Sequence, residues 1–365
     1  MADHSRIEWT EATWNPLIGC SRVSTGCRGC YAERMAARFA GEGQLYQGLI
    51  HPSTRGWNGT VRLMPDVLTK PLRWKRPRRI FVNSMSDLFH ESVPDAWIDQ
   101  IFAIMALSPH HTFQILTKRA ERMRRYLDGV SRHQVARAAL QFTGRKHPNG
   151  HDCDPVVCNT TWPLPNVWLG VSVENQETAD ERIPLLLQTH AAVRWLSCEP
   201  LLGPVDLTSV AWPDKDNHYV DVLRGGYWNA EGHLALGPSA ALGAQRGGFT
   251  NHSDMNRIDW VVVGGESGPG ARPMHRKWVL SLRDQCQADG AHTPFFFKQW
   301  GEWAPATSGI WFYMIGDDAP FAPRATSKNT HRFGDGFGAV RIGKKRTGRL
   351  LDGVLHNAYP EVSHG

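Results

Sequence analysis

The chain has 365 residues, of which 41% are hydrophobic, 41 are Lys or Arg and 35 are Asp or Glu, for a formal charge of +6. This length fits two average domains or one large α/β barrel, and the composition is ordinary for a soluble globular protein. No apolar run approaches the length of a membrane span, and the opening MADHSRIEWTEATW lacks the apolar segment of a signal peptide. These features argue against a helix that inserts into a membrane, so we expect no membrane partner and a cytoplasmic location.

Short apolar runs that end in polar residues recur along the chain, and most precede a stretch with apolar residues at helical spacing. This alternation predicts strand–helix units and a parallel sheet. The expected strands, in chain order, are residues 7–10, 79–87, 112–119, 166–175, 193–200, 258–268 and 294–300. The later ones are almost continuously apolar, as strands covered on both faces are. We therefore expect an α/β fold, a partial (β/α) TIM-like barrel of about six to seven parallel strands.

Two segments interrupt the strand–helix rhythm, residues 128–165 and residues 206–257, and we interpret both as loop insertions. Residues 1–303 would then form the partial barrel with its two insertions. Residues 304–365 would form a C-terminal extension, in which the sequence predicts no more than a short hairpin or helix.

Polar residues follow the predicted strands at their carboxyl ends, where parallel barrels build their active sites. They are Asn83, Ser84, Ser86, Asp87, Thr117, Lys118, Ser172, Glu174, Asn175, Ser197, Glu199, Glu266, Ser267, Lys298 and Gln299. One polar strand end carries little information, because loops are commonly polar, but a succession of them indicates one shared pocket. Gly264 and Gly265 would let the backbone approach a ligand closely, and Glu266 suits a ribose or an amine. The segment lacks the full GxGxxG spacing of a dinucleotide-binding fold.

Three of the seven cysteines lie within GCSRVSTGCRGCYAERMA, residues 19–36. Cys20, Cys27 and Cys30 have the spacing C-x6-C-x2-C, and a reducing compartment favours metal ligation over disulfides. A structural zinc site normally has four ligands, and the nearest histidines, His4 and His51, lie outside this loop. Three thiols alone suit a [4Fe–4S] cluster whose fourth iron is left for an external ligand. Cys30 is expected to begin a helix, whose dipole would favour the anionic cluster.

Six blocks between residues 14 and 274 resemble a phage-associated family known for a three-cysteine motif. They are WNPLIGCSRVSTGCRGCYAERMA, FVNSMSDLFHE, ILTKRAERM, NVWLGVSVENQ, SCEPLLGPVDL and VVVGGESGPGARPM. The cluster loop and the barrel pattern also resemble the radical S-adenosylmethionine enzymes, which more often have C-x3-C-x2-C with an aromatic residue before the last cysteine. The resemblance implies that three thiolates bind three irons and that S-adenosyl-L-methionine chelates the fourth. An electron from an external donor would then yield a 5′-deoxyadenosyl radical that abstracts hydrogen from a substrate.

The same resemblance assigns roles to the strand-end residues. The candidates for binding the cofactor are Ser172, Glu174, Asn175, Glu199, Gly264, Gly265 and Glu266, and those for facing the substrate are Asp87, Lys118 and Lys298. Each of the charged residues would equally fit a salt bridge in a loop.

The expected substrate is a nucleic acid or a nucleotide. The phage resemblance points to it, as does a basic strip of Lys70, Arg73, Lys75, Arg76, Arg78 and Arg79 that contains Trp74. Trp74 would stack on a base, or else pack under the loop while the cations are solvated. The alternative function is a non-catalytic, zinc-stabilised nucleic-acid-binding protein in which a distant His or Cys completes the three-cysteine site.

The four remaining cysteines fall into two groups. Cys153 and Cys158, near His147 and His151, form either a second metal site or a chance grouping with a loose C-x4-C spacing. Cys198 and Cys286 are expected to be ordinary buried thiols on a strand and on a helix.

Overall fold

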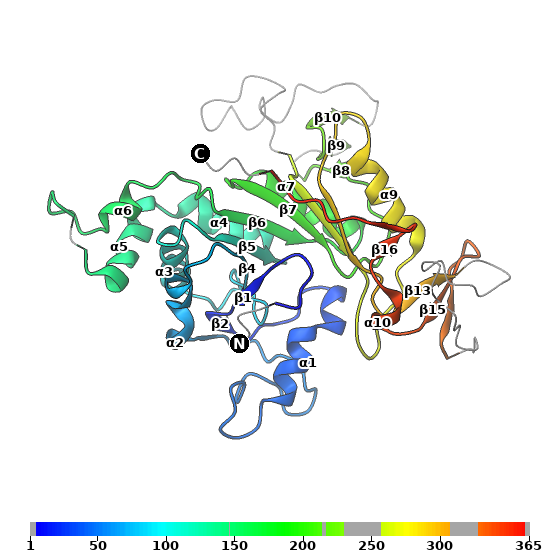
Figure 1. Ribbon diagram of the computed structural model, residues 1–365, viewed down its shortest axis with the longest axis horizontal. Coiled ribbons are helices and arrows are strands. Elements are labelled where there is room, and N and C mark those ends of the chain that lie inside the picture. The colour runs from blue at the N-terminus through cyan, green and yellow to red at the C-terminus, as the bar shows by residue number, and fades with distance from the viewer. Residues whose placement is uncertain (1–4, 146, 214–216, 230–256, 307–327, 362–365) are drawn as a thin grey trace. The chain divides into compact units, whose positions relative to one another are not determined.

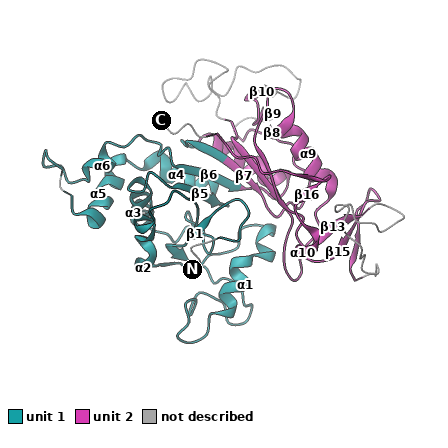
Figure 2. Cartoon of the chain, viewed as in Figure 1, with its two compact units in different colours: residues 1–171, 189–194 teal, residues 172–188, 195–365 magenta. Residues whose placement is uncertain are grey.

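The computed structural model describes residues 5–145, 147–213, 217–229, 257–306 and 328–361 (Figure 1). Its main sheet has seven parallel strands in the order β1-β4-β5-β6-β7-β11-β12. This confirms the predicted α/β fold with a partial barrel of parallel strands. The chain divides into two units, residues 1–171 with 189–194 and residues 172–188 with 195–365 (Figure 2).

The first unit contains four of these strands, paired in parallel. They are β1 (Ala12–Trp14), β4 (Arg79–Val82), β5 (Thr112–Thr117) and β6 (Val167–Ser172), whose last residue belongs to the second unit. Ile80 of β4 pairs with Ala12 of β1 and with Phe113 of β5, which fixes the register. Every residue of β6 is buried, as expected for a strand covered on both faces.

Helices of the first unit follow its strands (Figure 1). They are α1 (Tyr31–Arg38), α2 (Pro65–Leu68), α3 (Asp95–Ala106), α4 (Ala120–Gly129), α5 (Arg132–Thr143) and α6 (Pro155–Cys158), with the 3₁₀ turns η1 (Thr25–Gly29) and η2 (Lys70–Arg73). A short antiparallel pair, β2 (Leu17–Ile18) with β3 (Arg62–Leu63), lies next to the three-cysteine loop in the chain. α3 and α5 pack against each other, and the buried side of α3 includes Ile98, Ile101 and Phe102.

The expected strand at residues 7–10 is wrong. The N–H of Thr10 donates to the carbonyl of Ile7 at 3.2 Å, which makes this segment a turn, and the strand is Ala12–Trp14. The apolar pattern of this segment reflects a buried side chain and not a paired strand, because Trp9 is buried with its ring 4.8 Å from that of Phe81. An aromatic side chain can fill the core beside a sheet without its backbone joining the ladder.

The segment 128–165, expected to be a loop insertion, contains the helices α5 and α6. α5 begins with a capping box in which the hydroxyl of Ser131 accepts from the N–H of Gln134 at 3.1 Å and the Gln134 side chain accepts from the N–H of Ser131 at 2.6 Å. It ends at Gly144, whose φ of 64° is the left-handed conformation common after a helix. Asp154 caps α6, and Pro155 occupies its first turn.

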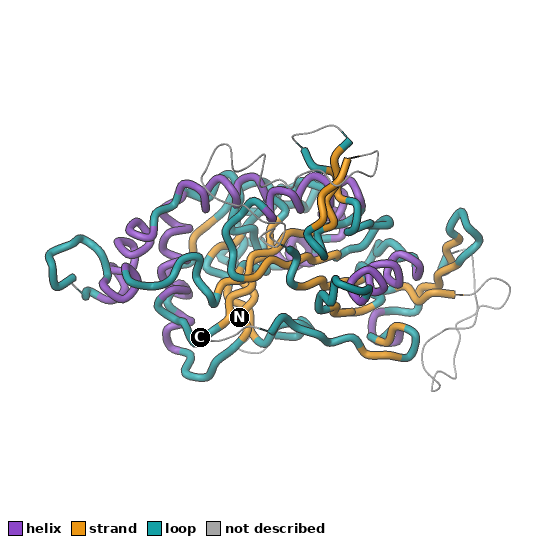
Figure 3. The backbone as a smooth tube through the Cα atoms, turned by 90° about the horizontal axis from the view of Figure 1, so that it is seen from above, coloured by secondary structure: helices purple, strands orange, loops and turns teal. Residues whose placement is uncertain are grey.

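The second unit contains the other three parallel strands with two long helices. These elements are β7 (Val193–Cys198, whose first two residues belong to the first unit), β11 (Trp260–Gly264), β12 (Phe295–Gln299), α7 (Gln176–Leu187) and α9 (Arg276–Gln287). Trp260 of β11 pairs with Trp195 of β7, and their rings lie 5.3 Å apart in the core. Figure 3 shows strands, helices and loops alternating along the chain.

Smaller sheets occupy the rest of the second unit. They are β10 (Gly226–Asn229), β9 (His218–Asp221) and β8 (Val210–Ala211); β13 (Trp303–Ala306), β15 (Gly338–Arg341) and β14 (Thr330–Arg332); and β16 (Leu350–Leu351) with β17 (Val354–Leu355), together with α10 (Lys344–Thr347). The expected insertion 206–257 therefore contains antiparallel strands as far as residue 229, and residues 230–256 lie outside the described part. The C-terminal extension holds more regular structure than the short hairpin or helix expected there.

Candidate functional site

The three-cysteine loop lies in the first unit, between β2 and α1. Gly19 precedes Cys20 with a φ of 97°, and a Cβ there would meet the carbonyl oxygen of Thr60 at 2.1 Å, so the position requires glycine. Cys27 lies in η1, and Cys30 is the residue that caps α1. The expectation that Cys30 begins a helix is confirmed.

Burial sets the protonation of these thiols. It raises the pKa of Cys20 to about 12, with the nearby Asp87 carboxylate acting in the same direction and Arg119 opposing it. Burial also raises the pKa of Cys30, against the backbone N–H groups at the start of α1. Both side chains are therefore thiols at neutral pH unless a metal displaces their protons. This disfavours Cys20 and Cys30 as free nucleophiles.

The spacing of the three sulfurs bears on which metal centre fits. In the described part of the chain, one group of three or more His, Cys, Asp or Glu side chains has all its ligand atoms within 4.8 Å of one another, and it lies elsewhere, at His133, Cys153 and Cys158. A single zinc ion needs every sulfur at about 2.3 Å from one centre. A cubane cluster binds each thiolate to a different iron, so its thiolates lie further apart. Cys20, Cys27 and Cys30 do not form such a group, and the three-thiolate cluster at this loop stays a prediction from the sequence.

A buried arginine connects this loop to the ends of β4 and β5. Nη1 of Arg119 lies 3.1 Å from Oδ2 of Asp87 and 3.9 Å from Sγ of Cys20, and Nη2 donates to Oγ of Ser21 at 2.8 Å. Nε donates to a carboxylate oxygen of Glu91 at 2.9 Å. Sequence reasoning missed Arg119, Ser21 and Glu91. Arg119 ends the predicted strand segment TFQILTKR, but the sequence does not show that its side chain turns toward the cysteines.

Asp87 and Lys118, expected to face a substrate, meet each other at the strand ends. Oδ1 of Asp87 accepts from the hydroxyl of Thr117 at 2.7 Å, and Oδ2 accepts from the backbone N–H of Lys118 at 3.1 Å. Asp87 is buried, and with the contact from Arg119 both of its oxygens have partners within the protein. Its contacts suit the positioning of Arg119 better than direct reaction with a substrate.

In the second unit, Ser172 and Glu174 are organised by another buried arginine. Nη1 of Arg182 donates to the carbonyl of Ser172 at 2.8 Å and to Oε2 of Glu174 at 3.1 Å. Both side chains of the ion pair are almost completely buried. Asn175 caps α7, because its Oδ1 accepts from the N–H of Thr178 at 3.1 Å. These contacts give each of the three predicted residues a structural task.

Glu199 and Lys298 form an ion pair between the ends of β7 and β12. Nζ of Lys298 lies 3.1 Å from Oε1 of Glu199, and the two side chains keep 17% and 14% of their surface exposed. Gly264 borders the pair, since a Cβ at this position would lie 2.3 Å from Oε1 of Glu199. Of the charged residues predicted at strand ends in this unit, these two combine mutual contact with access to solvent.

Gly265 and Glu266 are packed into the turn after β11. A Cβ on Gly265 would meet the carbonyl oxygen of Trp300 at 2.0 Å, so this glycine allows two backbone segments to approach. The carboxylate of Glu266 accepts from Nη2 of Arg272 at 2.7 Å and from Nε of the same side chain at 2.9 Å. Gln299 donates to Oγ of Ser267 at 3.0 Å.

The basic strip surrounds Trp74 in the first unit. The guanidinium of Arg78 lies 5.0 Å from the centre of the Trp74 ring and the ammonium of Lys70 lies 5.5 Å from it, distances at which cations and aromatic rings attract. Trp74 is partly buried, and Arg79 pairs with Glu11 at 3.5 Å. The exposed cations are Arg73, Lys75 and Arg76. The ring therefore packs against its own strip.

The remaining cysteines behave in two ways. Cys198 and Cys286 are buried on β7 and α9, as expected. The group beside Cys153 and Cys158 is His133, whereas His147 and His151 contact each other with ring centres 4.9 Å apart.

No helix in the described part of the chain is long and apolar enough to cross a membrane.

Comparison with known proteins gives one match. A family described as "Protein of unknown function (DUF5131)" matches residues 4–360, nearly the whole chain. No curated protein and no solved structure matches the chain.

Proposed function

Since the chain belongs to the DUF5131 family, whose description assigns no activity, we propose from its own residues that it is a radical S-adenosylmethionine enzyme. The observation that carries this proposal is the loop of Cys20, Cys27 and Cys30. It supplies three thiols in one loop that follows the first strand of a parallel barrel, with the buried cation Arg119 beside Cys20 and with Cys30 capping α1.

The three thiolates would hold three irons of a [4Fe–4S] cluster. With S-adenosyl-L-methionine bound, such a cluster supplies the electron that cleaves the sulfonium to a 5′-deoxyadenosyl radical. Arg119 stabilises the negative charge of this site, because its guanidinium is buried 3.9 Å from Sγ of Cys20. Cys30 holds its thiolate at the N-terminus of α1, where the helix dipole favours an anion. Asp87 keeps Arg119 in place through a 3.1 Å contact.

Among the residues predicted to bind the cofactor, Glu199 is the best suited to an incoming ligand. Its pair with Lys298 retains access to solvent, whereas Glu174 and Glu266 each already have an arginine partner. A carboxylate in this position suits the amine or the ribose hydroxyls of the cofactor, and Lys298 suits an anionic group. Gly264 leaves the space that this carboxylate needs.

The substrate class is proposed to be a nucleic acid or nucleotide, bound in part by the exposed cations Arg73, Lys75 and Arg76. An external donor must supply the electron, and a cytoplasmic, reducing location suits free thiols and an iron–sulfur cluster. The resemblance to a phage-associated family is also part of this proposal, because it favours a nucleic-acid substrate.

The test is anaerobic reconstitution of the full chain with iron and sulfide, followed by addition of S-adenosyl-L-methionine and a reductant. A brown protein with cluster absorbance that forms 5′-deoxyadenosine supports the proposal. The Cys153→Ala/Cys158→Ala double variant is the matched control, because it removes two thiols outside the loop and should keep all of its iron. A colourless protein that holds zinc at Cys20, Cys27 and Cys30 would favour the zinc-stabilised binding protein. A cluster that forms no 5′-deoxyadenosine and whose spectrum ignores the cofactor would be an electron carrier or a structural element.

A further inference from the structure

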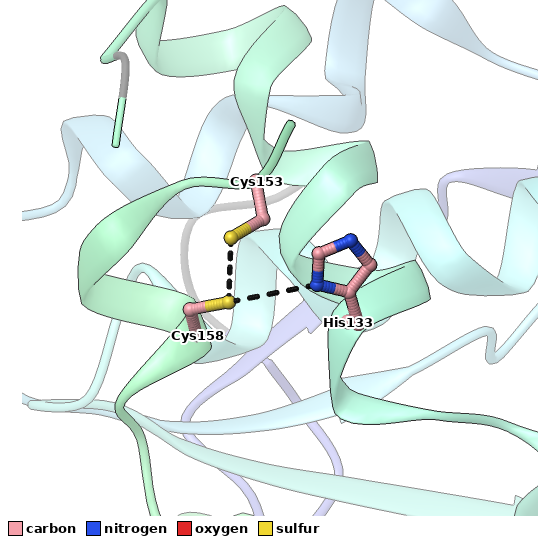
Figure 4. Close-up of side chains that lie close together, drawn as sticks. All are labelled: His133, Cys153 and Cys158. Carbon is pink, nitrogen blue, oxygen red and sulfur yellow. Dashed lines mark hydrogen bonds between the residues drawn. The ribbon is translucent and has the colours of Figure 1, made fainter. Parts of the chain in front are cut away.

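Two cysteines and a histidine converge in the helical segment that follows α4. Figure 4 shows Cys153, Cys158 and His133 pointing toward one another from three short stretches of the chain. The two sulfurs lie 2.6 Å apart, and Sγ of Cys158 lies 3.9 Å from Nδ1 of His133. All three ligand atoms lie within 4.8 Å of one another. This arrangement plays no part in the proposed radical chemistry.

The backbone that carries these side chains is held independently of any ion. The capping box of Ser131 and Gln134 fixes the first turn of α5, and His133 lies in that turn. The N–H of Asp154 donates to the carbonyl of Ala136 at 2.9 Å, which ties the residue after Cys153 to the same helix. The three positions are therefore set by hydrogen bonds at both ends of the group.

Asp154 fixes the second half of the group. Its buried carboxylate accepts from the N–H groups of Val156 and Val157 at 3.0 and 3.2 Å, and these start the turn of α6 that ends at Cys158. The same carboxylate accepts from the hydroxyl of Thr143, the last residue of α5, at 2.7 Å and from Nε of Arg145 just beyond that helix at 2.9 Å. This network fixes Asp154, and with it the start of α6, before any ion binds.

We propose that His133, Cys153 and Cys158 bind a zinc ion that joins the start of α5 to the end of α6. Two thiolates and one imidazole are a donor set that prefers zinc among the common divalent metals. Cys153 is buried while His133 is exposed, so an ion can enter from the solvent side, where rotation of His133 and Cys158 opens the group to bond lengths of about 2.0–2.3 Å. With three protein ligands, water completes the tetrahedral coordination.

Zinc binding here would release the thiol protons and stabilise the folded segment, because the unfolded chain does not present the three ligands together. The proposal does not depend on the radical chemistry, since none of its ligands belongs to the loop of Cys20, Cys27 and Cys30. The competing chemistry for two sulfurs this close is a disulfide, which would leave His133 without a role.

The decisive experiment is a cobalt titration of the reduced full chain in a Cys20→Ala/Cys27→Ala/Cys30→Ala background, which removes the thiols of the first loop. We expect one cobalt per chain, a thiolate-to-cobalt charge-transfer band and the visible bands of tetrahedral cobalt, all displaced by zinc. Cys153→Ser and Cys158→Ser should abolish these bands. His133→Ala should weaken binding by more than about 100-fold, the upper end of the loss caused by removing an outer-shell partner. His151→Ala and Cys286→Ser are matched controls that should bind cobalt normally.

A second measurement uses the wild-type chain and does not depend on that background. Zinc should protect Cys153 and Cys158 of the folded protein from alkylation. After the protein is unfolded and digested, the peptide that contains Cys286 serves as the internal reference for the amount of protein. The proposal is overturned if the reduced protein binds no cobalt, if His133→Ala binds it as tightly as its parent, or if zinc gives no protection. It is equally overturned if Cys153 and Cys158 remain a disulfide under a glutathione buffer of cytosolic potential.

Discussion

Nη1 of Arg119 lies 3.9 Å from Sγ of Cys20, so a buried cation faces one of the three thiols of the first loop. Asp87 and Glu91 hold the guanidinium on its other sides, at 3.1 and 2.9 Å. A positive charge at this distance from a bound cluster favours its more negative, reduced form. The arrangement therefore makes Arg119 a residue that sets the potential of the proposed centre.

Replacement of Arg119 should lower that potential. In Arg119→Gln, the reconstituted cluster should be harder to reduce by roughly 60 mV, which is tenfold in a one-electron equilibrium. The measurement is a redox titration followed by the cluster's electron paramagnetic resonance signal. Arg124→Gln is the control, because it removes a partly exposed cation of α4 that pairs with Glu121 and Asp128.

Because Arg119→Gln also leaves Asp87 buried without its cation, its unfolding should be measured alongside. The Asp87→Asn/Arg119→Gln double variant removes both charges and should recover stability while keeping the lowered potential. An unchanged potential in both variants would remove Arg119 from the site.

Loss of any one thiol of the first loop should abolish the cluster. Cys20→Ala, Cys27→Ala and Cys30→Ala should each lose the broad absorbance of a [4Fe–4S] centre, because a missing thiolate leaves a second iron open. Iron and sulfide content per chain, measured after anaerobic reconstitution, checks this. A full cluster spectrum in any one of the three variants would mean that the ligand set is different.

Glu174→Gln should destabilise the protein strongly. Its carboxylate pairs with Arg182 at 3.1 Å in full burial, and breaking such a pair leaves an uncompensated charge that costs about 3–5 kcal/mol in free energy of unfolding. Glu181→Gln is the matched control, because Glu181 contacts Nε of the same arginine at 3.6 Å but is 63% exposed. Denaturant unfolding of both variants measures the difference. Equal stabilities would show that Glu174 is free for another task, such as holding the cofactor.

His111 should make the stability of the fold depend on pH. Burial, aided by the neighbouring His110, lowers the pKa of His111 to about 4, below the value of about 6.5 in the unfolded chain. Between these values the unfolded chain binds the proton and the folded one does not. Stability is therefore complete above about pH 6.5 and falls as the pH drops toward 4.

The measurement for His111 is the free energy of unfolding at pH 7 and pH 5. His111→Gln keeps a donor for the carbonyl of Pro71, which Nε2 contacts at 3.2 Å, and should lose most of the difference between the two pH values. His110→Gln alters the exposed neighbour and should keep most of the difference, because burial is the largest cause of the shift in the pKa of His111. If His111→Gln retained the full pH dependence, another group would be responsible.

The sheet could be predicted because its strands are short runs of mostly apolar residues that end in polar ones. Six of the seven expected segments contain the strand of the structure, and β6 and β7 are buried at every position. The first segment was wrong because the side chain of Trp9 is buried in the core while the backbone of this segment forms a turn and not a strand. The helices α5 and α6 were missed although their caps, Ser131 with Gln134 and Asp154 before Pro155, were readable in the sequence.

The site divides in the same way. Local spacing located the three cysteines and the helix that begins after Cys30. The partners of the charged residues, Arg119 for Asp87 and Arg182 for Glu174, come from elsewhere in the chain or from the buried side of a helix, and a sequence does not show where a long side chain ends. The same limit explains why His133, rather than His147 or His151, lies beside Cys153 and Cys158.

The space kept by Gly264 ties the evolution of two distant positions together. Because a Cβ at 264 would lie 2.3 Å from Oε1 of Glu199, alanine is tolerated there only if the carboxylate moves or shortens. Substitutions at 264 and 199 should therefore be epistatic: each alters the effect of the other, and a lineage that gives up the glycine has to change Glu199 as well. That constraint also reaches Lys298, which would lose its ion-pair partner in the same step.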